Sequence, residues 1–276
     1  MRKRSAWPRL AAGLILGLIA AQQGRGNGAQ VPILRNQRTL QFPINFGMPD
    51  YLGGFTFCRL RYENSRYVRK SGWGDDYPAS DFNFMSRLSE LTTTTISRWA
   101  NGDPGFAQVT VMDPDLFRCP FLKMNNAANY DFTPDEVERL HEYLEKGGFL
   151  WMDDNWTDLD WSYIRPNVQK ILPGHPIVDL KPPHPLFSSL YRIDEVPQIP
   201  SLNSWLRSRA TDEFGGGPPH LYAVFGENDR LLMLVSLNID VSDSWEREGD
   251  SLDYFYAFSG KGYALGVNVV VWVTSH

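Results

Sequence analysis

Apolar residues in the first half of the chain form short runs that alternate with stretches of helical spacing. FTFCRLRYE (55–63) alternates apolar and polar residues and predicts a strand at the front of the domain. Residues 82–91 carry apolar side chains at helical spacing, and Asp81 precedes them as a predicted helix cap. QVTVMD (108–113) and PFLKMNN (120–126) predict two further short strands, separated by a turn.

The clearest helix signal is TPDEVERLHEYLEKGG, residues 133–148. Thr133 is placed to cap this helix, Pro134 suits its first turn, and Glu136 completes a capping box. A pair of glycines then ends it, and GGFLWMDDNW (147–156) predicts a buried strand. Because strand, helix and strand recur in this order, the pattern predicts a mostly parallel sheet covered by helices.

The second half of the chain has weaker periodicity. Residues 161–172 predict a helix, and the proline-rich residues 173–190 predict irregular structure. Residues 221–238 read as two strands joined by a turn, which predicts an antiparallel hairpin added to the sheet. Residues 263–273 are apolar and suit either a helix or a strand, and GGGPP (215–219) predicts a loop.

The N-terminus has the order of a secretory signal peptide. Basic residues between positions 2 and 9 precede an apolar stretch from Leu10 to Ala21, and small and polar residues follow. The apolar stretch is shorter than the ~20 residues that span a bilayer, although an uncleaved anchor is the alternative. We therefore expect a signal peptide at 1–29, an irregular lead-in at 30–52 and one domain at 53–276. The expected location is the periplasm or the extracellular space, with no permanent membrane span after cleavage.

Composition and charge exclude several classes of protein. The hydrophobic fraction of 42% is ample for a packed core. A net charge of −5 without long runs of either sign argues against a nucleic-acid partner. Cys58 and Cys119 are the two cysteines. They can pair if their Cα atoms come within about 7 Å, or remain two separately buried thiols.

Polar residues gather where the predicted strands end, and the carboxyl ends of parallel strands are where such sheets bind ligands. A glycine-containing loop is expected to close over the same edge, with two tryptophans as apolar walls. The candidate ligand-binding residues are Tyr62, Glu63, Trp73, Asp75, Asp76, Tyr77, Asn125, Asn126, Asn155 and Trp156. Two neighbouring acids, Asp153 and Asp154, are the candidate catalytic residues, together with His184.

Paired carboxylates admit several interpretations. They can act as acid and base, bind a divalent cation through oxygen, or grip the hydroxyls of a sugar-like ligand. Consecutive strand residues point to opposite faces, so Asp153 and Asp154 share a pocket only if the chain turns sharply there. One acid can instead cap the following turn while the other is solvated. No histidine pair at metal-ligand spacing occurs, and glycine patterns for nucleotides are absent, so we predict no metal site and no cofactor.

The chain resembles a bacterial family of domains of unknown function, DUF4159, from about Gly53 to His276. The motifs that carry this resemblance are FTFCRLRYE, GWGDDYPASDFNFMSRLSELTT, DPDLFRCPFLKMNN, FTPDEVERLHEYLEKGGFLWMDDNW, HPLFSSLYRIDEVPQIPS and GVNVVVWVTSH. The family is similar in turn to the class I glutamine amidotransferase-like superfamily. That similarity implies an α/β fold of the flavodoxin-like type, a three-layer sandwich with a mostly parallel sheet and the added antiparallel hairpin.

The resemblance also bears on chemistry. In glutamine amidotransferases the strand after a helix ends in a sharp turn that bears a nucleophilic cysteine, and here Asp153 and Asp154 stand at that place. Amidotransferase chemistry is therefore not expected. The segment with His184, Asp194 and Glu195 resembles trehalose-utilisation-type members, which suggests a carbohydrate.

The leading hypothesis is an exported domain that binds a small polar ligand or an envelope protein partner at the carboxyl ends of its strands. The alternative is a hydrolase that uses Asp153 or Asp154 as base or nucleophile, with His184 assisting. A scaffold in an envelope assembly is a third class. The sequence leaves open whether the protein is an enzyme.

Overall fold

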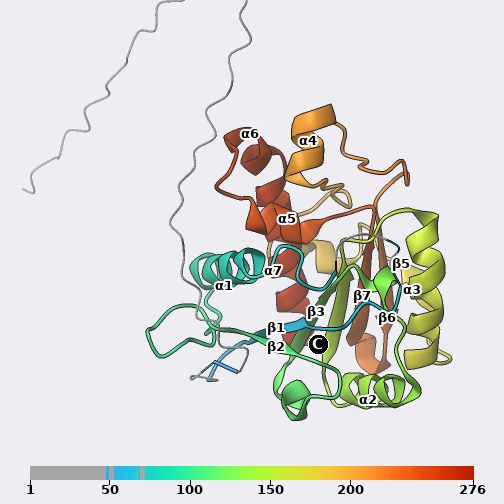
Figure 1. The fold of residues 1–276 in the computed structure, drawn as a ribbon. Helices are drawn as coiled ribbons and strands as arrows, with labels where there is room; N and C mark the ends of the chain where they lie inside the picture. Colours follow the sequence, from blue (N-terminus) through green and yellow to red (C-terminus); the bar gives the residue numbers. More distant parts are fainter. Residues whose placement is uncertain (1–47, 50–52, 67, 69–71) are drawn as a thin grey trace, which may run out of the picture. The chain divides into compact units, whose positions relative to one another are not determined.

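The structure is a computed structural model that describes residues 48–49, 53–66, 68 and 72–276 (Figure 1). The chain divides into Met1–Pro32 and Ile33–His276, and every described residue belongs to the second unit. The predicted signal peptide and most of the lead-in lie outside the described residues. Within the described part, no helix combines the length and the apolar character that crossing a membrane requires.

The described residues form a seven-stranded sheet in the order β2-β1-β3-β4-β7-β6-β5. The first five strands in this order run parallel to their neighbours, whereas β6 runs antiparallel to both β7 and β5. The predicted mixed α/β class and mostly parallel sheet with an antiparallel part are confirmed. The strands are β1 (Phe57–Leu60), β2 (Phe106–Val109), β3 (Phe121–Asn125), β4 (Phe149–Asp153), β5 (Ile177–Asp179), β6 (His220–Phe225) and β7 (Leu231–Leu237).

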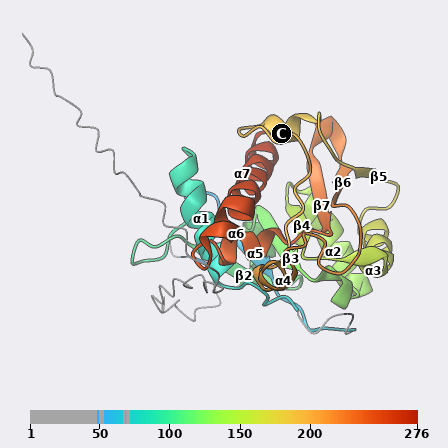
Figure 2. The ribbon, with the colours of Figure 1, turned by 90° about the horizontal axis from the view of Figure 1, so that it is seen from above.

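Helices cover both faces of the sheet (Figure 2). One face packs against α1 (Ala79–Leu91), α5 (Val241–Glu246) and α7 (Gly260–Ser275) in a core rich in aromatic side chains. The other face packs against α2 (Pro134–Glu145) and α3 (Thr157–Ile171). Shorter segments complete the fold: α4 (Leu202–Ser208), α6 (Leu252–Tyr254), a π-helical turn (Phe255–Ser259), and 3-10 turns at Pro114–Arg118, Ala127–Asn129, Pro185–Ser188 and Glu227–Asp229.

Alternation along β3 and β4 decides which side chains face α1 and α7. Phe121 and Trp151 belong to the core on that face, whereas Leu122 and Met152 belong to the opposite core. Residues two positions further along a strand share a face. Lys123, Asn125 and Asp153 therefore all face the α1 and α7 side, and Asn125 and Asp153 are the last residues of their neighbouring strands.

Helix α2 forms as its local signals predict. The Glu136 backbone nitrogen donates to Thr133 Oγ1 at 3.4 Å, and Glu136 Oε2 accepts from the Thr133 backbone nitrogen at 2.9 Å, so the capping box is confirmed. Pro134 is the first helical residue. Gly147 follows with φ of 106°, a conformation that favours glycine, and the chain then enters β4.

The structure corrects two other predictions and decides between the two alternatives of a third. Asp81 does not cap α1, because its carboxylate is buried in an ion pair with the Arg59 guanidinium on β1. Residues 173–190 are not wholly irregular, since Ile177–Asp179 adds β5 to the edge of the sheet. The C-terminal segment is a helix, α7, and not a strand.

Cys58 and Cys119 form a disulfide, which decides between the two alternatives for these cysteines. Their Cα atoms are 5.8 Å apart, within the range that a disulfide bridges. The bond links β1 to the residues just before β3, and both cysteines are buried in the core on the α2 and α3 side.

Candidate functional site

The three central strands β3, β4 and β7 each end in a left-handed turn. The residue after each strand has positive φ: Asn126 at 52°, Asp154 at 55° and Asn238 at 59°. Asparagine and aspartate adopt this conformation more readily than other non-glycine residues. Such strained backbone gathers at functional sites, and here three examples lie at one edge of the sheet. The turn at Asp154 is the sharp turn that allows two adjacent acids to point different ways.

A pocket of about 180 Å³ lies at this edge. Six carboxylates line it, and they come from the loop before α1, the turn after β4, the loop before β6 and the start of α5. None of the described residues that line it is basic. The lining consists of Asp75, Asp76, Asn126, Asp154, Trp156, Ser201, Glu213, Phe214, Asp240 and Asp243.

Burial and mutual repulsion raise the pKa of several of these acids. Burial raises the pKa of Asp154 to about 7, and the nearby Asp75 carboxylate adds to the effect. Burial likewise raises the pKa of Asp243 to about 6. The pKa values of Asp76 and Asp240 are also raised, first by burial and then by neighbouring carboxylates. The charged form of this pocket is therefore costly unless a positive partner is present.

Asp154 is held in the pocket by two neighbouring side chains. Its Oδ1 accepts a hydrogen bond from Trp156 Nε1 at 2.8 Å, and its Oδ2 accepts one from Asn126 Nδ2 at 3.0 Å. Neither donor is charged, so they fix the position of the carboxylate without neutralising it.

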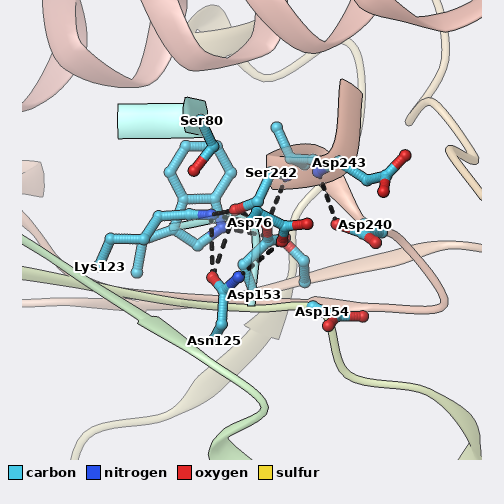
Figure 3. A network of polar contacts seen from close by, with 12 residues as sticks. Asp76, Ser80, Lys123, Asn125, Asp153, Asp154, Asp240, Ser242 and Asp243 are labelled. Atoms are coloured by element: carbon cyan, nitrogen blue, oxygen red, sulfur yellow. Dashed lines mark hydrogen bonds and ion pairs between the residues drawn. The ribbon is translucent and has the colours of Figure 1, made fainter. Parts of the chain in front are cut away.

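Asp153, the acid before it, does not line the pocket. Its side chain is fully buried, and its Oδ2 accepts hydrogen bonds from Lys123 Nζ at 2.6 Å and from the Ser242 backbone nitrogen at 3.0 Å. Figure 3 shows this network, in which Lys123 extends toward Asn125, Asp153 and Ser242. Asp153 is therefore placed as part of the internal framework and out of reach of a ligand.

Lys123 is the buried cation of this framework. Burial lowers its pKa, and the Asp153 carboxylate opposes that effect. Its ammonium also lies 5.2 Å from the Trp151 ring centroid and 5.0 Å from the Trp245 ring centroid, within cation–π range. Among the described residues, Lys123 thus has one ion-pair partner and two aromatic rings within cation–π range.

The family model of the domain of unknown function DUF4159 matches residues 56–274. The chain belongs to this family. No curated protein matches the chain. The matched range begins just before β1 and ends one residue before the end of α7, so the DUF4159 domain contains all six carboxylates of the pocket.

The structure brings together four of the ligand-binding residues predicted from the sequence and one of the candidate catalytic residues, Asp154. Asp75, Asp76, Asn126, Asp154 and Trp156 all line the pocket of this DUF4159 domain. The two acids of the glycine-containing loop, Asp75 and Asp76, therefore lie beside the strand ends.

Three predicted residues do not line the pocket but hydrogen-bond to the strand ends and to Asp76, which lines it. The Tyr62 hydroxyl donates to the backbone oxygens of Asn125 and Asn126 at 2.7 and 2.9 Å. Asn125 Nδ2 donates to Asp76 Oδ2 at 2.9 Å, and Asn155 Nδ2 donates to the Ser236 backbone oxygen at 3.2 Å. All three side chains are buried, so they hold the strand ends without contacting a ligand.

The remaining predicted residues lie apart from the pocket lining. Glu63 is exposed, and the rings of Trp73 and Tyr77 pack against each other with centroids 5.6 Å apart. His184 packs against Phe225 and Trp272. Phe225 pairs with the first residue of β7, so His184 lies at the opposite edge of the sheet from the carboxyl ends. It is therefore not placed to assist an acid in the pocket.

Four charged residues of this site were missed by sequence reasoning: Lys123, Glu213, Asp240 and Asp243. The signal for Asp240 and Asp243 is their position directly after a buried strand, in LVSLNIDVSD. The hairpin was predicted, but its second strand, β7, also pairs in parallel with β4, which brings its carboxyl end to the same edge. Local sequence contains no comparable signal for Glu213.

The raised pKa of Asp154 predicts a pH dependence of stability. Its folded pKa of about 7 lies above the unfolded value of about 3.9, so the native state binds the proton more tightly. The resulting stabilisation is fully present below about pH 4 and is lost as the pH rises toward 7. Asp154→Asn is expected to reduce the fall in the free energy of unfolding between pH 5 and pH 7.5, measured by urea denaturation. An unchanged slope would show that Asp154 does not titrate in this range.

Proposed function

We propose that this DUF4159 domain is an exported ligand-binding domain whose acidic pocket receives a small polar ligand. One observation carries the proposal: six carboxylates line a single pocket, and no described lining residue is basic. Like charges held close together in a partly buried site destabilise each other. A ligand that brings positive charge, or hydroxyl donors, relieves this repulsion and is therefore favoured.

The size and walls of the pocket narrow the class of ligand. A volume of about 180 Å³ suits one small group and not an extended chain. The Trp156 and Phe214 rings, with centroids 5.5 Å apart, provide an apolar wall beside the acids. Carboxylates next to an aromatic ring suit a compact, hydroxyl-bearing molecule such as a carbohydrate.

The proposal of export has two supports. The N-terminal sequence has the order of a signal peptide, and Cys58 and Cys119 form a disulfide. Disulfides persist in the periplasm and outside the cell and are rare in the cytoplasm. We accordingly propose that the domain acts in the periplasm or extracellular space.

The finer fold assignment is also a proposal. A parallel sheet with helices on both faces and a ligand pocket at the carboxyl ends of its strands is consistent with a flavodoxin-like, amidotransferase-like domain. The sharp turn after β4 carries Asp154 where amidotransferases carry a cysteine. This supports a fold related to those enzymes without their chemistry.

Thermal unfolding with a panel of neutral sugars, amino sugars and polyamines tests the binding proposal. A ligand present at a hundredfold excess over its Kd is expected to raise Tm by about 5–10 °C. Asp154→Asn should abolish this rise, whereas Asp135→Asn, an exposed acid at the start of α2, should retain it. A rise of equal size in both variants would remove the pocket as the binding site.

A hydrolase is the second candidate, and the position of Asp154 favours it. The left-handed turn presents this carboxylate to the pocket, and a pKa of about 7 suits a general base or acid near neutral pH. Incubating the same protein with glycosides, esters and amides separates the two functions. Formation of product that depends on Asp154 supports turnover. If no product forms but a ligand raises Tm, the result supports binding alone.

A further inference from the structure

Two groups of three carboxylates at the pocket have the spacing of a metal site. Asp76, Asp154 and Asp240 form the first, and Asp76, Asp243 and Glu246 form the second. In each group, one oxygen from each residue lies within 4.8 Å of the others. Oxygens bound to one Ca²⁺ at 2.3–2.6 Å are at most about 5 Å apart. Both groups therefore satisfy the distance requirement for a shared cation.

The second group already has a positive partner. Arg247 Nε lies 2.7 Å from Glu246 Oε2 and 3.9 Å from Asp243 Oδ1. A guanidinium at this position balances charge that a metal ion would otherwise balance. The second group is therefore the weaker candidate.

The first group has no such partner among the described residues. Two buried cations, Arg59 and Lys123, act on Asp76, but each is hydrogen-bonded to another carboxylate. Arg59 Nε donates to Asp81 at 3.3 Å, and Lys123 Nζ donates to Asp153 at 2.6 Å. Asp76 accepts a hydrogen bond from the neutral amide of Asn125. This group therefore has no ion-pair partner of its own within the described part of the chain.

A buried carboxylate oxygen without a hydrogen bond gives an independent indication. Asp240 is 5% exposed, and only its Oδ1 accepts a hydrogen bond, from the Asp243 backbone nitrogen at 2.9 Å. Its second oxygen has no donor within the described part of the chain, although Asp240 lines the pocket.

We propose that Asp76, Asp154 and Asp240 bind a divalent cation through carboxylate oxygens. Oxygen-only coordination selects hard cations such as Ca²⁺, Mn²⁺ and Mg²⁺. The sequence predicted no metal site, because no histidine pair has metal-ligand spacing. The three acids lie far apart along the chain, so their proximity depends on the fold. The inference rests on the proposed function and deepens it. Three protein ligands leave coordination positions open, and hydroxyl or carboxylate oxygens of the bound ligand fill them.

Calorimetric titration of the full chain with CaCl₂, MnCl₂ or MgCl₂, after EDTA treatment and desalting, tests this site. We expect saturable binding of at least one of these cations. Asp240→Asn should weaken it by about tenfold or more, because the number of charged ligands sets the affinity. The asparagine oxygen can still cap α5, so the fold is retained. Asp154→Asn provides a second test of the same site.

Glu246→Gln is the matched control, since it removes one charge from the neighbouring group. It should change the affinity by less than about threefold, because Arg247 already neutralises that side chain. Equal losses in Asp240→Asn and Glu246→Gln would overturn the assignment to the first group. Absence of binding up to about 10 mM, above the range of extracellular calcium modules, would overturn the cation site altogether.

The outcomes for this site and for the proposed function are separable. If sugars or amines raise Tm in EDTA through Asp154 and no cation binds, the cation site is wrong and the proposed function stands. If a cation binds through Asp240 but no ligand from the panel raises the Tm of the loaded protein, the cation site stands and the proposed ligand class is wrong.

Discussion

Replacing Asp153 with alanine is expected to lower the free energy of unfolding by about 3–5 kcal/mol. The substitution removes the carboxylate that pairs with Lys123 at 2.6 Å, and both side chains are fully buried. An ammonium left without its anion in the interior must lose its proton or draw in water, and either response is costly. Urea denaturation at pH 7.5, with a constant m-value, measures the loss.

The matched control replaces both charged partners. Lys123→Met with Asp153→Leu fills similar volumes without leaving a lone charge, so it should recover much of the stability. Asp154→Asn, one position along the chain, should cost far less because Asp154 lies in the pocket. A loss below about 1 kcal/mol for Asp153→Ala would contradict the framework role that we assign to this residue.

Removing the disulfide with Cys58→Ala and Cys119→Ala is expected to lower the free energy of unfolding by about 4 kcal/mol. The two cysteines are 61 residues apart in the sequence, so the bond restricts a long loop of the unfolded chain. Alanine is preferred to serine here, because both positions are buried among apolar side chains. Guanidinium denaturation under oxidising conditions measures the difference.

Reduction of the unaltered protein supplies the control. A strong reductant should shift its denaturation midpoint toward that of the double alanine variant and leave the variant unchanged. If reductant has no effect on the unaltered protein, the two cysteines are not linked in solution.

Elements with local signals could be predicted from the sequence. The Thr133 and Glu136 capping box and the glycine after it define α2 within a few residues of chain, and β4 follows from its apolar run. β5 was missed because three residues in a proline-rich segment carry no periodicity, and its strand character comes from pairing with β6. Asp81 has the position of a helix cap, but Arg59 on a distant strand takes its carboxylate.

The residues of the candidate site likewise divide into those that have a local sequence signal and those that do not. Asp154 and Asn126 were predicted because they directly follow strands that the sequence reveals. Asp240 was missed because its place depends on β7 inserting beside β4, a pairing between residues more than 80 positions apart. Lys123 lies in an otherwise apolar strand, and nothing in the local sequence explains its charge. The explanation is the ion pair with Asp153, which only the folded structure reveals. The positions of these missed residues depend on long-range strand pairing, which the local sequence pattern does not reveal.

The acids of the pocket span the chain from Asp75 to Asp243. A peptide or proteolytic fragment that lacks either end of this span lacks part of the site, so fragment screens and peptide arrays will not find it. During synthesis the segment with Asp240 and Asp243 emerges last among them. Nascent chains therefore acquire their binding ability late, only after β7 has taken its place between β4 and β6.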